Sequence, residues 1–161
     1  MQQINILSMP EINLLGISTR TCNSNEQNSS KAKIFPLLKK YFSHSFSEKI
    51  LNRANPNTTF IAYTDYESNY TGEYTCMIGE EITKNSNQDN SLDQITIPTQ
   101  SYMKFTSEVG ALPEIVINLW NKIWEMKELE NRRSYIADFE VYDHRSIDPS
   151  NAIVDIYIGV K

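Results

Sequence analysis

The elements expected along this chain follow one order twice: strand, helix, strand, strand. Alternation of apolar and polar residues predicts the strands, and apolar residues at three- and four-residue spacing predict the helices. In chain order, the predicted elements are a strand over residues 12–21, a helix around 34–41, a short helical piece at 47–52, strands over 60–67, 73–82 and 95–107, a helix from 113 to about 129, and strands over 134–145 and 152–160. Two similar halves usually pack about a pseudo-two-fold axis, and the groove where they meet is a common ligand site.

A faint repeat in the residues accompanies this order. The segment FIAYTD, which begins at Phe60, aligns with YIADFE, which begins at Tyr135, and MIG at residues 77–79 aligns with YIG at residues 157–159. Under this alignment we expect Asp65 to be the counterpart of Glu140.

Two prolines and one polar stretch set the expected boundaries. Pro36 is tolerated in a helix only within the first turn, so the start of the first helix stays open. Pro98 is expected at the start of its strand or on a sheet edge, because it has no N–H for a central ladder. Residues 83–94 carry almost no apolar side chains and are the best candidate for a long loop and for disorder.

The predicted strand over 134–145 has two chemically different faces. Phe139 and Val141 fall on one face, and Asp138, Glu140 and Tyr142 fall on the other. A carboxylate beside an aromatic ring in the middle of a strand lies either on a solvated face or in a ligand groove.

The helix predicted from residue 113 carries two adjacent apolar stripes. They cover roughly 200° of the helix, which is wider than a helix on a sheet usually needs, so the extra surface must be covered. The first stripe consists of Leu112, Ile115, Val116, Leu119, Ile123 and Met126, and the second of Ile117, Trp120 and Trp124.

The two interpretations of these residues differ in where the aromatic rings lie. In the first, Trp120 and Trp124 wall a pocket into which Glu140 projects, and further rings come from Tyr142, Tyr157 and Tyr63. A carboxylate ringed by aromatic faces suits a cation. In the second, both tryptophans belong to the core and the carboxylate is solvated.

The charge balance and motif content limit the classes of function. The net charge of -5 removes the usual attraction to nucleic-acid phosphates or anionic lipid, and a cationic partner fits better. Cys22 and Cys76 are read as reduced thiols. His44 and His144 lack metal-site spacing, so no metal or cofactor is expected. An acid/base pair could in principle come from Asp65, Asp138 and Glu140, but no catalytic motif accompanies them.

The sequence also contains features that bear on the cellular compartment. A secretory signal begins with basic residues, but no Lys or Arg precedes Arg20. No apolar run approaches the length that spans a bilayer. We therefore expect a cytoplasmic protein without a membrane partner.

Three ordered segments resemble the GyrI-like effector-binding domain, which occurs at the C-termini of some AraC-type and MerR-type transcription regulators and as free-standing proteins. The similarity covers roughly residues 10–161. The three segments are AYTDYESNYTGEYTCMIGEEI at residues 62–82, KFTSEVGALPEIVINLWNKIWEM at 104–126 and SYIADFEVYD at 134–143.

The resemblance implies a single domain over residues 1–161. Its expected fold is α+β, with duplicated β-α-β-β units related by pseudo-two-fold symmetry, an antiparallel sheet that forms a central ligand groove, and helices packed on one side. It also implies that Glu140 sits in the groove and meets cationic, hydrophobic ligands. With the resemblance, the first interpretation of the aromatic residues is favoured.

The chain looks most like the stand-alone subgroup. About 11 residues precede the first predicted strand, too few for a helix-turn-helix, so direct operator binding is not expected. The favoured function is binding of a hydrophobic, cationic small molecule. The alternatives are a hydrolase that uses Glu140 as general acid or base, and a protein-interaction module whose partner is a regulator or DNA gyrase.

Overall fold

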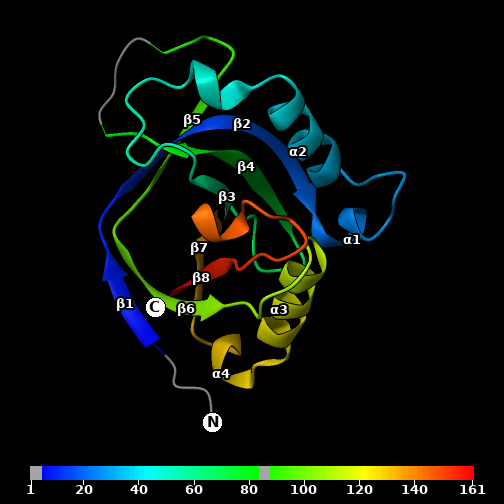
Figure 1. Cartoon of the computed structure of the whole chain (residues 1–161). Coiled ribbons are helices and arrows are strands. Elements are labelled where there is room, and N and C mark those ends of the chain that lie inside the picture. Colours follow the sequence, from blue (N-terminus) through cyan, green and yellow to red (C-terminus); the bar gives the residue numbers. More distant parts are fainter. Residues whose placement is uncertain (1–4, 84–87) are drawn as a thin grey trace.

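The structure is a computed structural model and describes residues 5–83 and 88–161 (Figure 1). The strands are β1 Asn5–Met9, β2 Ile12–Cys22, β3 Thr59–Thr64, β4 Glu73–Glu81, β5 Asp93–Ile97, β6 Gln100–Thr106, β7 Arg133–Tyr142 and β8 Asp155–Val160. The α-helices are α1 Asn23–Glu26, α2 Ile34–Ser43, α3 Glu114–Glu125 and α4 Lys127–Glu130, and the 3-10 helices are η1 Phe46–Lys49 and η2 His144–Ser146.

The strands form one antiparallel sheet in the order β1-β6-β8-β7-β3-β4-β2-β5. The central pair is β7 and β3. Next to β3 lies β4 and then β2, and next to β7 lies β8 and then β6. The units β2-α2-β3-β4 and β6-α3-β7-β8 are therefore arranged symmetrically about the central pair. This confirms the expected α+β fold with duplicated β-α-β-β units.

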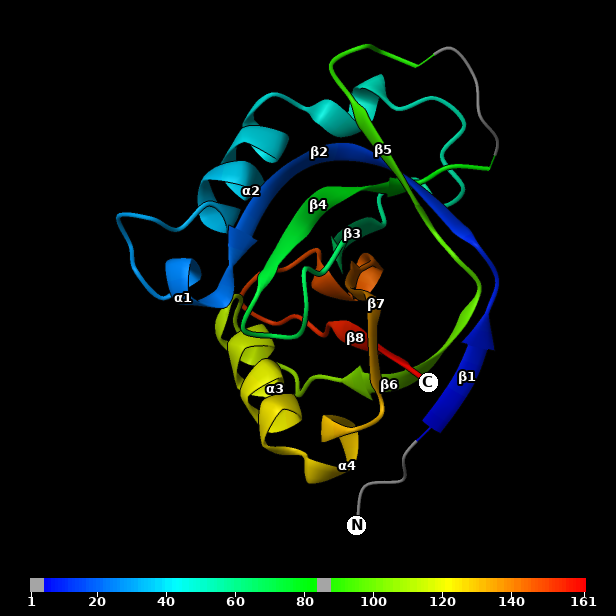
Figure 2. The same cartoon turned by 180° about the vertical axis from the view of Figure 1, so that it is seen from behind.

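The outer strands of the sheet were not predicted correctly. The single strand expected over residues 95–107 is two strands, because Pro98 lies between β5 and β6 and cannot donate to a ladder. An additional strand, β1, precedes the first predicted strand and is separated from it by Pro10 and Glu11. Because β1 runs into β2 and β5 runs into β6, the sheet curls around itself, as Figures 1 and 2 show.

The strand register corrects the sequence repeat. In the first half Ile61 lies opposite Ile78, and in the second half Asp138 lies opposite Ile158. Because the two isoleucines of the hairpin strands are equivalent, Asp138 is the counterpart of Ile61, and the sequence alignment, which matched Ile61 with Ile136, is shifted by two residues.

The same shift changes the counterpart of Glu140. With Asp138 equivalent to Ile61, Glu140 becomes equivalent to Tyr63, so the expectation that Asp65 occupies this position is wrong. Asp65 lies just beyond β3, where the backbone turns with a φ of 51°. A tyrosine therefore stands on one side of the pseudo-two-fold axis where a glutamate stands on the other.

The two faces of the sheet have different cores. On one face, α2 and η1 cover the first half, and α3 and α4 cover the second half, which confirms that the helices pack on one side (Figures 1 and 2). Tyr41 and Leu37 of α2 pack on Ile61 and Ile78. The other face of the sheet has its own apolar core, which includes Phe60, Ala62, Met77, Tyr102, Ala137 and Phe139.

The second long helix is shorter than predicted. At Met126 the backbone is extended (ψ 107°), so α3 ends at Glu125 and α4 forms a separate turn. The first predicted stripe is confirmed, and its members Ile115, Val116, Leu119 and Ile123 are buried. The second stripe is only partly covered: Ile117 is 54% and Trp124 51% exposed, whereas Trp120 is half-buried.

The polar stretch before β5 is shorter than the predicted loop, since β5 already begins at Asp93. Part of the expectation of disorder, at residues 84–87, lies outside the described residues. Within the described part of the chain, no helix is long and apolar enough to cross a membrane.

Candidate ligand-binding groove

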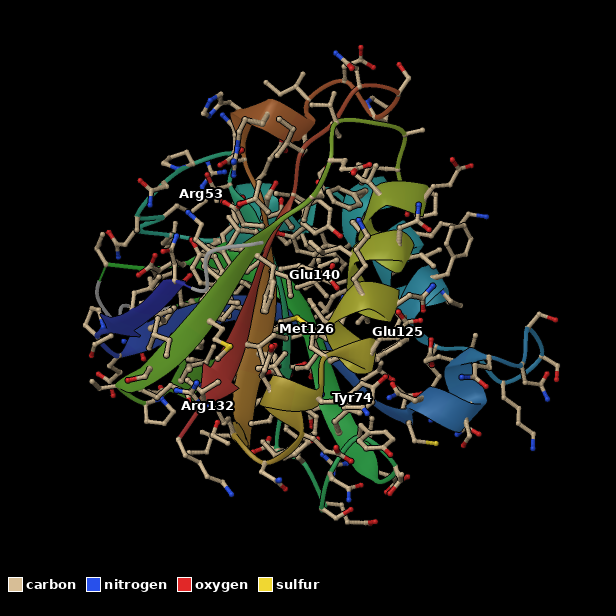
Figure 3. All side chains as sticks on the ribbon, turned by 90° about the horizontal axis from the view of Figure 1, so that it is seen from below. Arg53, Tyr74, Glu125, Met126, Arg132 and Glu140 are labelled. Carbon is tan, nitrogen blue, oxygen red and sulfur yellow. The ribbon has the colours of Figure 1, made fainter. Side chains whose placement is uncertain are left out.

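Glu140 is the most unusual residue of the helix-covered face. It lies on β7 at the centre of the sheet, and its side chain is only 2% exposed. Figure 3 shows it deep in the molecule, beside α3. Tyr63 and Trp120 donate hydrogen bonds to Oε2, each 2.7 Å long, and Tyr142 donates to Oε1 at 2.5 Å. The side chains that meet here come from β3, α3 and β7.

These three donors suit an ionised carboxylate. A carboxylate is an acceptor with about four lone-pair positions, and an indole N–H can only donate. Burial raises the pKa of Glu140, while the hydrogen bonds from Tyr142, Tyr63 and Trp120 oppose this rise. Burial and the negative charge of Glu140 raise the pKa of Tyr63 and of Tyr142, so both phenols remain protonated donors.

The carboxylate has hydrogen bonds but no counter-ion. Among residues 5–83 and 88–161, none of the ion pairs involves Glu140. Hydrogen bonds spread its charge without neutralising it, and a buried charge is costly unless it is paired. The site is therefore electrostatically incomplete in the protein alone.

Aromatic rings lie close to this carboxylate and to one another. Trp120 packs edge-on against Tyr63, with ring centroids 5.6 Å apart, and Tyr63 makes a similar contact with Tyr74. Trp124 lies one turn further along α3, with its ring 5.8 Å from that of Trp120. Five of the six predicted site residues, Glu140, Trp120, Tyr142, Tyr63 and Trp124, are thus gathered on one face.

Tyr157 is the exception, and its predicted place beside Glu140 is wrong. It lies opposite Phe139 on the neighbouring strand, so its side chain projects from the other face of the sheet. There its ring stacks on Phe139 at 4.7 Å and belongs to the opposite core. The period-two pattern within β8 was correct, but the sequence did not show which face of β8 matches which face of β7.

A hollow of about 160 Å³ is lined by Tyr63 and Trp120, two of the residues that donate hydrogen bonds to Glu140, which itself lies beneath this lining. It shares four lining residues with a larger hollow of about 540 Å³. The smaller hollow is lined by Asn23, Glu26, Ile34, Tyr63, Tyr66, Tyr70, Tyr74, Trp120, Trp124 and Arg133. Residues shared by both hollows are Asn23, Tyr70, Trp124 and Arg133. We call the two together the groove; its far wall is formed by Glu125, Met126 and α4 (Figure 3).

A side chain from α1 holds the first wall of the groove in place. Glu26 accepts hydrogen bonds from the backbone N–H groups of Lys33 (2.9 Å) and Ile34 (3.1 Å), at the start of α2. A carboxylate is well suited to the unpaired N–H groups and positive dipole end of a helix start. Pro36 then lies in the first turn of α2, as its missing N–H requires.

A second buried carboxylate, Asp138, lies two residues from Glu140 on the same face. Unlike Glu140 it has a counter-ion, because Nη2 of Arg133 lies 2.6 Å from its Oδ2. Tyr66 also donates to Oδ2, and the backbone N–H of Gly159 donates to Oδ1 at 2.8 Å. One of the two acids is thus neutralised within the protein and the other is not.

Arg133, Tyr66 and Tyr74 are groove residues that sequence reasoning missed. Arg133 reaches the groove through an irregularity in β7: it lies opposite Val160, whereas Asp138 lies opposite Ile158. Five steps along β7 therefore correspond to two steps along β8. In a regular strand, residues five positions apart point to opposite faces, but the bulge turns Arg133 toward the same face as Asp138. Tyr135, at φ 52°, takes up the bend. No pattern in the sequence predicts such a bulge.

In the described part of the chain, no group of three or more His, Cys, Asp or Glu side chains is placed to hold a metal ion. Cys22 and Cys76 are both free, and Cys76 is buried in β4.

Comparisons with known proteins agree with this geometry. Residues 5–160 match the family described as integron-associated effector binding protein, Cass2. The chain is 31% identical over 147 residues to YobU of Bacillus subtilis (strain 168), which is provisionally named as a transcriptional regulator; the match covers 91% of this chain and 90% of YobU.

Two solved structures share the fold. One is an integron cassette protein from the mobile metagenome of Vibrio cholerae, with a TM-score of 0.76, 27% identity, and coverage of 99% of this chain and 97% of that chain. The other is SAV2435 bound to tetraphenylphosphonium, with a TM-score of 0.79, 18% identity, and coverage of 99% and 94%. The fold, the near-complete coverage and the family match lead to one conclusion: this chain belongs to the Cass2 family of effector-binding proteins, which has the GyrI-like fold.

Proposed function

We propose that this protein binds a hydrophobic small-molecule cation in the groove, with Glu140 as the group that selects positive charge. The observation that carries the proposal is a carboxylate that is 2% exposed, accepts three hydrogen bonds and has no cationic partner within the described residues. A ligand that brings a positive charge and excludes water would supply the missing counter-ion.

The walls of the groove favour a cation that is also apolar. Aromatic faces attract positive charge, and Trp120, Trp124 and Tyr63 lie in edge and tilted contacts around the approach to Glu140. The combined hollows fall in the volume range that accommodates small organic molecules. A strongly hydrated ion such as an alkali metal would have to give up its hydration shell to contact these rings, which offsets the attraction.

The comparisons support the same class of ligand. SAV2435, which shares the fold, was solved with tetraphenylphosphonium, an apolar cation whose charged centre is surrounded by four phenyl groups. The name of YobU supports a role in transcriptional regulation, with the ligand as signal. We propose that this chain senses or sequesters the ligand in the cytoplasm and does not itself contact DNA; its net charge of -5 opposes binding to phosphates.

The proposal can be tested with a pair of ions of nearly equal shape and opposite charge. Tetraphenylphosphonium and tetraphenylborate would each be titrated into the protein while the fluorescence of Trp120 and Trp124 is recorded. We expect saturable quenching by the phosphonium and an affinity for the borate at least about tenfold weaker, a difference of about 1.4 kcal/mol. Equal affinities, or a preference for the borate, would show that the groove does not select positive charge.

A further inference from the structure

Arg133 occupies the junction of the two hollows that form the groove. It lines both of them, and its side chain is only 7% exposed. Its guanidinium lies over the ring of Tyr135, 4.5 Å from the ring centroid, and Tyr135 in turn contacts Tyr66 edge-on. A bulge with a left-handed, non-glycine residue turns this arginine into the groove. Such backbone conformations are costly and cluster at functional sites.

The guanidinium has more donors than the protein uses. It carries five N–H bonds. Nη2 donates to Asp138 at 2.6 Å, but Nε is buried and has no hydrogen-bond partner within the described residues. A buried donor without a partner typically costs about 1–3 kcal/mol. An acceptor in the groove beside Arg133 would remove part of this cost once a small movement of the side chain brings Nε to it.

The surroundings of Arg133 select a neutral acceptor. Asp138 already compensates its positive charge, and both oxygens of Asp138 are occupied, by Arg133 and Tyr66 on one side and by the N–H of Gly159 on the other. A second anion would compete with Asp138 and would lie close to the unpaired charge of Glu140. A carbonyl oxygen can accept a hydrogen bond without either penalty.

We propose that the groove contains a second subsite, at Arg133, for a neutral carbonyl oxygen of the same ligand whose positive charge lies at Glu140. This inference rests on the proposed function and narrows the ligand class to hydrophobic cations that carry an ester or amide carbonyl. Glu140 and Asp138 are two residues apart on one strand, which corresponds to about 6.6 Å. The carbonyl therefore lies roughly 7 Å from the positive charge.

The test uses two cations of matched chain length. Trimethylammoniopropyl octanoate carries an ester carbonyl near the required distance, and dodecyltrimethylammonium carries none. Both would be titrated below their micelle-forming concentrations, with tryptophan fluorescence as the readout. The quantity of interest is the ratio of the two affinities, ester over alkyl, because it cancels the shared contribution of the charge at Glu140.

Two variants change or remove the donors of Arg133 without leaving a lone buried charge. Arg133→Lys keeps a cation beside Asp138 but loses Nε–H and the fork of donors. The double variant Arg133→Met/Asp138→Asn removes both charges together. We expect the affinity ratio to fall by about tenfold in each, as the loss of one good hydrogen bond implies. Glu140→Gln serves as the matched control: it should weaken both cations and leave the ratio unchanged.

The outcomes separate this inference from the proposed function. An affinity ratio that is the same in wild type and in both Arg133 variants would overturn the carbonyl subsite while leaving cation binding intact. If neither cation binds the wild-type protein, the proposed function fails and the subsite fails with it. If Glu140→Gln weakens neither cation, the charge assignment fails, and the Arg133 variants still decide whether the carbonyl is recognised.

Discussion

The phenol of Tyr63 donates a hydrogen bond of 2.7 Å to the carboxylate of Glu140, although the two residues are 77 positions apart in the chain and lie in different halves of the fold. The strand register makes them equivalent positions of the two β-α-β-β units. One unit thus supplies the acid and the other supplies a donor that holds it. The site exists only when the two halves are paired through β3 and β7.

The substitution Trp120→Phe should shift the pH dependence of cation binding. It removes the 2.7 Å hydrogen bond from the indole while it keeps an aromatic ring. Hydrogen bonds from Trp120 and its neighbours lower the pKa of Glu140 against the effect of burial, so losing one should raise that pKa further. Binding needs the ionised form of Glu140. As the pH is lowered, the affinity of this variant for tetraphenylphosphonium should therefore begin to fall at a higher pH than that of wild type.

Trp124→Phe is the matched control for this experiment. Trp124 lies on the same helix and contacts the ring of Trp120, but Glu140 accepts its hydrogen bonds from Trp120, Tyr63 and Tyr142. Isothermal titration calorimetry over a pH series would give both profiles. If the two variants shift the profile equally, the indole hydrogen bond is not what tunes the carboxylate.

Glu140→Gln should alter how stability depends on pH. Burial raises the folded-state pKa of Glu140 above its unfolded value, so the folded state binds a proton more readily. The stability contribution of this group is fully present below the unfolded pKa and is lost as pH rises through the folded pKa. Relative to Glu140→Gln, wild type should therefore become more stable as the pH falls through this window.

Urea unfolding of both proteins at a series of pH values measures this difference. Taking the difference between the two free energies of unfolding cancels the contributions of the other titrating groups. A difference that does not vary with pH, or that varies in the opposite sense, would show that the pKa of Glu140 is not raised by folding.

The ion pair between Arg133 and Asp138 should be more costly to break than to replace. Its distance is 2.6 Å, and the two side chains are 7% and 0% exposed. Arg133→Met alone leaves Asp138 as an unpaired buried charge, and we expect a loss of about 3–5 kcal/mol in the free energy of unfolding. Adding Asp138→Asn should restore most of it, because the amide oxygen can still accept from Tyr66 or Gly159.

A double-mutant cycle in urea measures this coupling. If the double variant is as unstable as the sum of the two single variants, the pair does not act as a neutral unit. That result would also remove the reason to expect a neutral ligand group beside Arg133.

The sequence predicted the centre of this fold better than its margins. Alternation along residues 138–142 correctly placed Glu140 and Tyr142 on one face and Phe139 on the other, because a strand has a fixed period of two. Helical spacing correctly brought Trp120 toward that face. These are local rules, and they hold wherever the local element is regular.

The failures are all matters of register or of irregular backbone. Tyr157 was assigned to the wrong face because local patterns do not give the register between β7 and β8, and a shift of one residue reverses the faces of a strand. Arg133 was missed because a bulge between it and Asp138 turns it toward the face of Glu140. Tyr66 lies beyond the end of β3, after Asp65 at φ 51°, where the period of two no longer applies.

Two prolines mark breaks between strands at the margins of the sheet. Pro98 cannot lie inside a central ladder, and it separates β5 from β6 where one strand is predicted. Pro10 marks the equivalent break between β1 and β2. Both breaks lie where the chain passes from one half of the sheet to the other, which no local pattern reveals.

The most direct test of the account is the affinity of Glu140→Gln for tetraphenylphosphonium, compared with wild type and with Glu48→Gln. Glu48 is an exposed residue of η1, so its substitution makes the same change in net charge away from the groove. We expect Glu140→Gln to lose affinity by about 30-fold or more, or about 2 kcal/mol, and Glu48→Gln to bind as wild type does. Equal affinities for all three proteins would contradict the claim that this buried carboxylate is the cation-selecting group.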